Sequence, residues 1–438
     1  MRRTIPVAFK SQASSFAISF RKLRFYSTAF FYARGMDSGR GGLFLSRAID
    51  KHFPSNIIEE EWIFLQGGRH LERNLTQLSA QEHARLGSGQ MSTVLVAQYL
   101  RDGGFALRTF PEVLRSLCPG QDLQAHLTDA LAADEPEASP ATLAKVVRNW
   151  LTGKAKPTRR EEIFHIAFAL GFSEPQADLL LGHCTDYGIH YREGRDVVYA
   201  WFLRNGGSYL QARAFFASLP PIPRPDQPPK GAGAQITHEM QSAFLLAHTQ
   251  EDLRACYLAN LKNFGALHTR AYAYFSRYLD RLIHPVPEWT GLAEPDYSME
   301  AVMDLYLRMK MPSSRSRTDM GVIQRLIKSN WPNTTALKNI RNRKADVPRK
   351  LLLLFYIITE NAADEEYRET DEDYLTPQQR LDDHWYAINA MLTDCGMPPL
   401  DPRNAFDWLV LYAVTADEES MSERMEAVIE QLFSGLSE

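Results

Sequence analysis

Cysteine is scarce in this chain and follows no metal-binding pattern. Four cysteines, Cys118, Cys184, Cys256 and Cys395, are spread over 438 residues, and no two are spaced as Cys-x-x-Cys. Neither a zinc knuckle nor a disulfide framework is therefore predicted. Isolated thiols are typical of a reducing compartment, so we expect a cytoplasmic protein.

Long apolar runs are also absent. The longest, from Leu351 to Ile358, directly follows Arg349 and Lys350. A membrane-spanning helix needs about 20 apolar residues, and this run is far shorter. The sequence therefore predicts no transmembrane segment and no membrane partner.

Signatures of catalysis are missing as well. The chain contains no Walker loop and none of the GxGxxG, HExxH or GxSxG motifs. The nearest group of potential ligands is Asp382-Asp383-His384, but neighbouring residues on a helix point in different directions, so at most two could share a metal. We interpret this group as surface charge, and His183 and His190 as structural. We expect no enzymatic activity, no cofactor and no bound metal.

The N-terminal segment lacks acidic residues. Residues 1–35 contain no Asp or Glu and are rich in Arg, Ser and Phe, a composition typical of an organellar transit peptide. The alternative interpretation is a translation start at Met36 or Met91. In either case this segment lies outside the expected fold, and we assign no structure to residues 36–90.

Helix signals dominate the remainder. Capping boxes begin at Thr109, Thr158, Ser173 and Thr376, whereas Asn-Gly hairpins and sustained alternation are absent. With 45% hydrophobic and 23% charged residues, the composition is that of a globular protein. We predict an all-α, multi-domain protein. Its expected parts are a first helical module at 91–218, a Pro-rich linker at 219–235, a middle helical region at 236–295, and a second helical module at 296–438 with an acidic insertion at 360–373.

The chain also resembles itself. At an offset of 190 positions four residues match without a gap, and at an offset of 211 an Arg-x3-Asp pattern before an apolar helix recurs. We therefore predict a duplicated module in which residues 139–200 and 330–415 share one helix order. We also predict that each Arg-x3-Asp forms an ion pair across one helical turn. The matched residues are Asn149/Asn339, Lys154/Lys344, Ala155/Ala345, Arg159/Arg349, Arg192/Arg403 and Asp196/Asp407.

The first copy contains a helix, a turn with glycine and proline, and a second helix. The residues of this pattern are Val147, Trp150, Gly153, Lys154, Pro157, Ile166, Ala167, Leu170 and Gly171. Over about residues 109–173 the chain resembles a lambda-repressor/Cro-type (XRE-like) helix-turn-helix domain, most closely over its last 35 residues. It departs from that family before the helix at 139–151, where residues 133–138 (ADEPEA) form a longer and acidic connection.

The resemblance implies a DNA-binding surface. In such domains the helix at 139–151 enters the major groove, and flanking basic groups contact phosphates. Residues 139–160 include six basic residues and no acidic one, although the net charge of the whole chain is −4. Val147 and Trp150 are expected in the core. The implied DNA-binding residues are Thr142, Lys145, Arg148, Lys154, Lys156 and Arg159.

A second basic patch occurs in the second copy. Its residues are Lys338, Arg341, Arg343 and Lys344, and Arg343 stands at the position of the glycine in the first copy. Two interpretations are open: a second DNA-binding element, or a degenerate helix-turn-helix kept for packing.

Two functions therefore compete. The first is a bacterial-type DNA-binding transcriptional regulator that uses residues 139–160, with the remainder serving dimerisation or sensing. The alternative is a non-catalytic helical scaffold in which the helix-turn-helix shape serves contacts with protein partners or self-association. Exposure of the basic residues on one face would favour DNA, and burial of the 139–151 helix against the linker or second copy would favour the scaffold.

Overall fold

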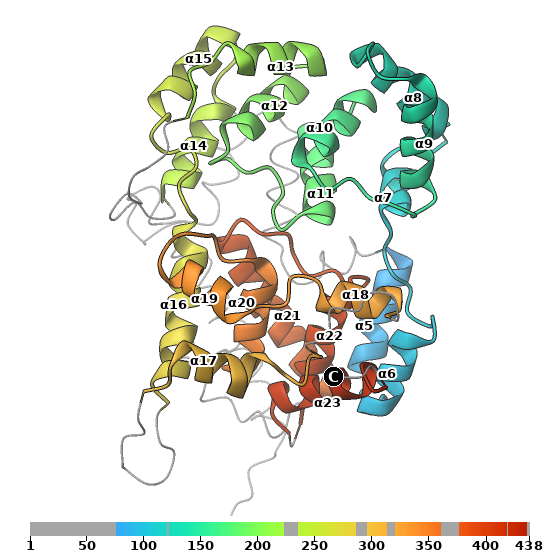
Figure 1. Ribbon diagram of the computed structural model, residues 1–438, viewed down its shortest axis with the longest axis vertical. Helices are drawn as coiled ribbons and strands as arrows, with labels where there is room; N and C mark the ends of the chain where they lie inside the picture. Colours follow the sequence, from blue (N-terminus) through green and yellow to red (C-terminus); the bar gives the residue numbers. More distant parts are fainter. Residues whose placement is uncertain are drawn as a thin grey trace, which may run out of the picture. The chain divides into compact units, whose positions relative to one another are not determined.

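The computed structural model describes residues 76–120, 122–222, 235–285, 296–312, 320–360, 376–417 and 419–435, without the side chains of 235–239 (Figure 1). Within these ranges the regular structure is entirely helical, with nineteen α-helices and one π-helical turn, which confirms the predicted all-α class. No helix in the same ranges is long and apolar enough to cross a membrane. The expected transit peptide, most of the 219–235 linker and nearly all of the acidic insertion lie outside the described residues.

Eleven helices precede residue 260, and those predicted from capping residues begin close to the expected positions. They are α5 (Gln77–Gly87), α6 (Thr93–Arg101), α7 (Phe110–Leu117), α8 (Leu123–Asp134), α9 (Pro140–Leu151), α10 (Arg160–Ala169), α11 (Glu174–Cys184), α12 (Gly194–Arg204), α13 (Tyr209–Ala217), α14 (Gln235–Leu245) and α15 (Gln250–Ala259).

The remaining elements begin with the long helix α16. They are α16 (Thr269–Ile283), α17 (Met299–Val302), the π-helical η1 (Met303–Leu307), α18 (Val322–Lys328), α19 (Thr334–Arg341), α20 (Arg349–Ile358), α21 (Pro377–Asp394), α22 (Ala405–Ala413) and α23 (Met421–Leu432).

Capping explains where several of these helices begin. The predicted boxes at Ser173 and Thr376 are present and start α11 and α21. The box predicted at Thr158 is wrong by one position: Arg159 is the N-cap of α10, and the Glu162 carboxylate accepts the N–H groups of both Thr158 and Arg159. A carboxylate in the first turn also interacts favourably with the helix dipole.

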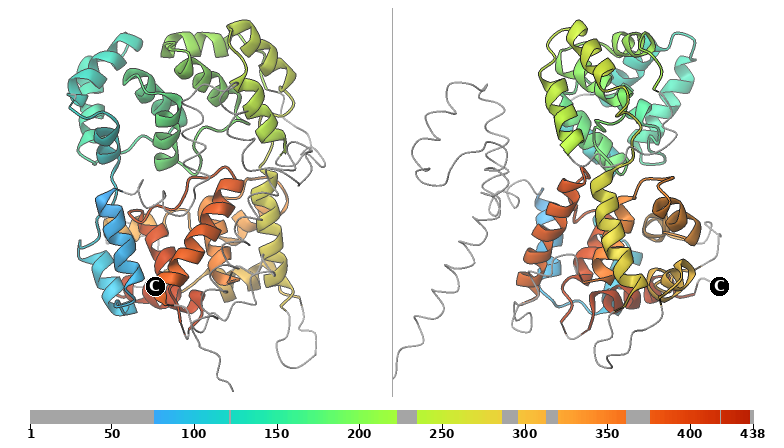
Figure 2. Two further views of the ribbon diagram at one scale, coloured as in Figure 1. Left: turned by 180° about the vertical axis from the view of Figure 1, so that it is seen from behind. Right: turned by 90° about the vertical axis from the view of Figure 1, so that its left-hand side faces the viewer.

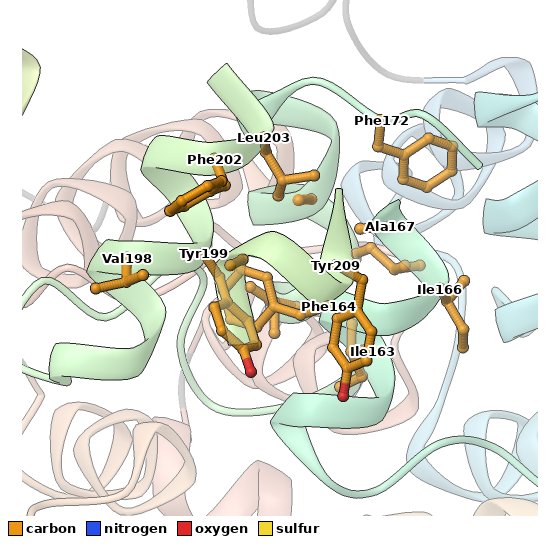
Figure 3. Close-up of a cluster of buried hydrophobic side chains, with 14 of the residues drawn as sticks. Ile163, Phe164, Ile166, Ala167, Phe172, Val198, Tyr199, Phe202, Leu203 and Tyr209 are labelled. Atoms are coloured by element: carbon orange, nitrogen blue, oxygen red, sulfur yellow. The ribbon is translucent and has the colours of Figure 1, made fainter. Parts of the chain in front are cut away.

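Helix α10 lies in the middle of the core that α7–α15 share. Residues 163–167 on α10 are all buried, and they pack with aromatic side chains from α12 and α13, including Tyr199, Phe202 and Tyr209 (Figure 3). In the C-terminal half, α20 has the same character, with residues 351–357 all buried. The longest apolar run of the sequence is thus a core helix.

Two helical hairpins pack against helices distant in sequence. Helix α5 packs on α21 and α6 on α23 (Figure 2), so residues 91–101, expected with the first module, contact the C-terminal helices instead. Helices α14 and α15, from the expected middle region, pack on α12. Nothing in a local sequence pattern specifies such pairing, because the partners lie far apart in the chain.

Candidate nucleic-acid interface

Helix α9 has one buried side and one exposed side. Its first turn contains Pro140, where the missing N–H donor costs nothing, and it packs against α7 and α8. Val147 and Trp150 are only 0% and 8% exposed, which confirms their predicted place in the core. Arg115 on α7 donates from Nη2 to the carbonyl of Leu151 at 3.1 Å and so satisfies the C-terminal end of α9.

The exposed side of α9 carries the predicted DNA-contacting residues. Thr142, Lys145 and Arg148 are all exposed, and their spacing of three residues places them along one side of the helix. Within the described residues neither Lys145 nor Arg148 forms an ion pair. Both charges are therefore available to an incoming anion.

The turn after α9 is closed by a left-handed glycine. Gly153 has φ 71°, the conformation that commonly ends a helix, and the N–H of Ala155 donates to the carbonyl of Asn149 at 3.2 Å. Pro157 is buried at the far end of the turn, whereas Lys154 is exposed and has no ion-pair partner in the described part of the chain.

Lys156 lies apart from this group. It is exposed, but its charge acts on the end of α11: burial is the main cause that lowers the pKa of His183 to about 4, and Lys156 adds to that effect. Burial likewise raises the pKa of Cys184 to about 12, and Lys156 opposes that shift. The charge of Lys156 therefore acts on the C-terminal end of α11, while its side chain is exposed to solvent.

The two arginines after the turn differ from what the basic run suggests. Arg159 pairs with Glu162, although its side chain remains 78% exposed. Arg160 turns inward, where its guanidinium contacts the carboxylate of Asp196 and donates to the carbonyls of Tyr187 and Gly188. The predicted site is thus strongest at Thr142, Lys145, Arg148 and Lys154.

The acidic connection before α9 contacts a histidine of α10. It spans residues 135–139, longer than the three or four residues usual in a helix-turn-helix. His165 on α10 lies 2.9 Å from Asp134 through Nε2 and 3.6 Å from Glu135 through Nδ1, and its ring stacks on Tyr209. Two of the three carboxylates that precede α9 therefore face His165. His165 was not predicted from the sequence, because its only signal is its place on a helix among apolar residues.

The second basic patch is largely engaged within the protein. Lys338 on α19 pairs with Glu300 at 2.5 Å. Arg343 donates to the carbonyls of His268 at 3.0 Å and Leu267 at 3.3 Å, and its guanidinium lies 4.3 Å from the centre of the Tyr272 ring. Arg341 and Lys344 are exposed. The four residues thus do not form one free cationic face.

The predicted ion pairs across one helical turn are wrong. Arg192 and Arg403 precede the first residues of α12 and α22, so neither is in helical register with the following aspartate. Asp196 is bound by Arg160, and Asp407 is bound by Arg349 at 2.7 Å. Arg403 instead pairs with Glu112, with Nη2 to Oε2 at 2.7 Å.

Groups that resembled ligand clusters have other roles. Asp382 accepts from the Gln378 amide at 2.9 Å, whereas His384 Nδ1 lies 2.8 Å from the Tyr356 hydroxyl. His190 contacts His268 through their Nε2 atoms. Among the residues that the structure describes, no three His, Cys, Asp or Glu side chains are grouped so that they could bind a metal ion.

Comparison of the chain with protein-family models, with curated proteins and with solved structures found no match.

Proposed function

We propose that this protein binds duplex DNA through α9 and the turn that follows it, and that it acts as a transcriptional regulator. The observation that carries the proposal is the contrast between the two sides of α9. Val147 and Trp150 anchor one side in the core, while Thr142, Lys145 and Arg148 are exposed on the other. A rigid helix with an accessible basic face is what major-groove binding requires.

Each exposed group has a role in such a complex. Thr142 and Lys145, nearer the start of α9, would reach base edges, where hydroxyl and ammonium groups find acceptors. Arg148 would contact a base or the adjacent phosphate. Lys154, in the turn closed by Gly153, would contact a phosphate and fix the register of the helix on the duplex without reading sequence.

The charge distribution favours a local contact over general adhesion. The chain as a whole carries a net charge of −4, so its overall field does not attract DNA. The imidazole of His165 contacts the carboxylates of Asp134 and Glu135, two of the acidic groups that precede α9. Binding should therefore depend on the few free cations of this face and be sensitive to salt.

A selection experiment tests the proposal. The full chain is incubated at low salt with a random-sequence duplex library, and the enriched duplexes are titrated by fluorescence anisotropy over a range of salt concentrations. We expect enrichment of defined sequences and an affinity that falls linearly with salt on logarithmic axes, with a slope of about −0.9 per phosphate contact. Absence of any duplex binding at low salt would favour the scaffold function.

A further inference from the structure

We propose that the chain consists of two copies of one helical unit, and that the second copy uses its basic turn to bind the connector between the copies. A consequence is that each chain presents one DNA-contacting helix. That consequence rests on the proposed function, whereas the duplication and the bound connector do not. The evidence is a set of hydrogen bonds that recur between residues in corresponding positions of the two halves.

The loop between α11 and α12 and the loop between α21 and α22 have the same internal bonds. Ile189 donates its N–H to Asp178 Oδ1 at 2.6 Å, and Leu400, 211 positions later, donates to Asn389 Oδ1 at 2.8 Å. The N–H groups of His190 and Asp401 likewise donate to the carboxylates of the aspartates that follow six residues later, at 3.0 and 2.9 Å. The acceptors are also 211 positions apart.

The arginines at the first positions of α10 and α20 also correspond, so the counterpart of Arg349 in the structure is Arg160 and not Arg159, with which the sequence comparison paired it. Arg160 donates to the carbonyls of Tyr187 and Gly188. Arg349 donates to the carbonyls of Pro398 and Pro399, which stand 211 positions after those two residues. Each arginine also binds an aspartate in the first turn of the second helix after its own: Arg160 on α10 binds Asp196 on α12, and Arg349 on α20 binds Asp407 on α22. Bonds of this specificity at two equivalent sites are most simply explained by duplication.

Each unit also contains a helical hairpin whose turn is fixed by an aromatic side chain. Trp201 on α12 donates from Nε1 to the carbonyl of Ala247, between α14 and α15, at 2.7 Å. Tyr412 on α22, again 211 positions later, donates from its hydroxyl to the carbonyl of Met91, between α5 and α6, at 2.9 Å. The first unit is therefore completed by the hairpin that follows it, and the second by a hairpin from the N-terminal side of the chain.

The connector that leaves each hairpin is bound by an arginine of the unit on which that hairpin packs. The guanidinium of Arg192 donates to the carbonyl of Leu267 at 2.6 Å, and its backbone carbonyl accepts the N–H of Gly265 at 2.8 Å. The guanidinium of Arg403 donates to the carbonyl of Ala106 at 2.8 Å, and its backbone carbonyl accepts the N–H of Arg108 at 2.9 Å. These contacts explain the recurrence of both arginines better than a helical ion pair does.

The two basic turns have different residues at the position with a left-handed backbone. Gly153 and Arg343, 190 positions apart, both have left-handed backbones, with φ 71° and 55°. Glycine adopts this conformation freely, whereas an arginine does so at a cost. Arg343 has a compensating role, because its guanidinium binds the connector carbonyls of Leu267 and His268. Asp346 in the same turn accepts the N–H of His268 at 2.6 Å.

The second turn is thus directed inward and the first outward. With Arg343 bound to the connector and Lys338 paired with Glu300, the α19 region lacks the continuous free face of α9. One chain then presents one DNA-contacting helix, and a target with two half-sites requires two chains.

The replacement Arg343→Gly in the full chain should shift the urea midpoint in opposite directions, depending on whether Arg343 binds the connector or is only a surface cation. If Arg343 binds the connector, the urea midpoint falls, and amide hydrogen exchange at Gly265 and His268 becomes about tenfold faster, the change expected when a charge-assisted hydrogen bond is lost. If Arg343 is only a surface cation, glycine relieves the backbone cost, the midpoint rises and exchange at both amides is unchanged. The second result would overturn the inference.

Four further variants complete the test. Lys344→Ala, the adjacent exposed residue, should change neither readout. Arg343→Lys retains the charge but not the planar group that spans two carbonyls, so it should also accelerate exchange and provides the measurement if the glycine variant does not fold. Arg192→Ala keeps the backbone carbonyl that accepts the N–H of Gly265 but removes the side-chain bond to Leu267, so it should loosen that connector and accelerate exchange at Gly265 but not at Arg108. Arg403→Ala, which removes the side-chain bond to Ala106, should do the reverse. If neither replacement accelerates exchange in its connector, the inference that both units bind a connector in the same way is wrong. This outcome does not depend on whether the protein binds DNA.

Discussion

The guanidinium of Arg160 binds the carboxylate of Asp196 across the first helical core, with Nε to Oδ2 at 3.0 Å. Asp196 also accepts the N–H of His190 at 3.0 Å. Its side chain is 4% exposed, so the charge depends on these donors instead of water. Removal of one partner from such a pair leaves the other charge buried and uncompensated.

We therefore expect Asp196→Ala to reduce the free energy of unfolding by about 3–5 kcal/mol. Asp129→Ala, which removes an exposed carboxylate on α8, should change it by no more than about 0.5 kcal/mol. Urea denaturation followed by circular dichroism gives both values. Equal effects of the two replacements would show that the Arg160 pair contributes nothing specific.

Trp150 and Arg148 separate packing from DNA contact on α9. Trp150→Ala should cost about 3–5 kcal/mol, because it leaves a cavity among buried side chains. Arg148→Ala should alter stability by about 0.5 kcal/mol or less but weaken DNA binding. Thermal melts and anisotropy titrations of both variants decide the matter. Strong destabilisation by Arg148→Ala without a separate effect on DNA would identify this face as an internal contact.

Gly194 tests the packing of the α14–α15 hairpin on α12. A Cβ atom at this position would lie 2.8 Å from Cε2 and 2.9 Å from the hydroxyl of Tyr257, a buried residue of α15. Gly194→Ala should therefore destabilise the protein by about 1–3 kcal/mol through overpacking. Gly321→Ala is the control, since its Cβ would meet no atom closer than 3.4 Å. If Gly194→Ala is no more costly than the control, the hairpin is not closely packed.

Two histidines that contact each other, His268 and the half-buried His190, should make stability depend on pH. Burial lowers the pKa of His268 to about 4 and is also the main cause that lowers the pKa of His190 to about 2. The unfolded chain, with a histidine pKa of about 6.5, then binds more protons than the folded one, so stability falls as the pH decreases from about 6.5 to 4.

The variant His190→Asn/His268→Asn removes this contribution. The pair is surrounded by Tyr187, Arg192 and Asp346, and Asp346 has a pKa raised mainly by burial, which gives the opposite slope. All three remain in the variant, so their effects largely cancel in the comparison. Urea midpoints measured between pH 6.5 and 4 should vary less with pH in the variant; an unchanged dependence would refute the assignment.

The sequence predicts features that depend on local periodicity and capping. The all-α class follows from the helix caps, and the burial of Val147 and Trp150 follows from their spacing on α9. Long-range partners are not predictable in this way. Trp408 donates to the Glu82 carboxylate at 2.9 Å, and no pattern near either residue indicates the other.

Charge patterns mislead for the same reason. Arg160 belongs to the basic run in the sequence, but its charge is used inside the core. Arg343 matches the basic turn by position, yet it binds the connector between the two halves. A list of cations cannot separate those that face solvent from those that face backbone carbonyls, because that distinction depends on the tertiary fold.

The salt dependence of affinity distinguishes most directly between DNA binding at α9 and DNA binding at α19. Anisotropy titrations compare the wild type with Lys145→Ala/Arg148→Ala/Lys154→Ala and with the matched control Arg341→Ala/Lys344→Ala. The first variant should bind all duplexes more weakly, and its logarithmic salt slope should be shallower by about 2 to 3, since each lost phosphate contact contributes about 0.9. The control should match the wild type in affinity and slope. An unchanged salt slope in the first variant, or an equal loss of DNA affinity in the control, would contradict DNA binding at α9.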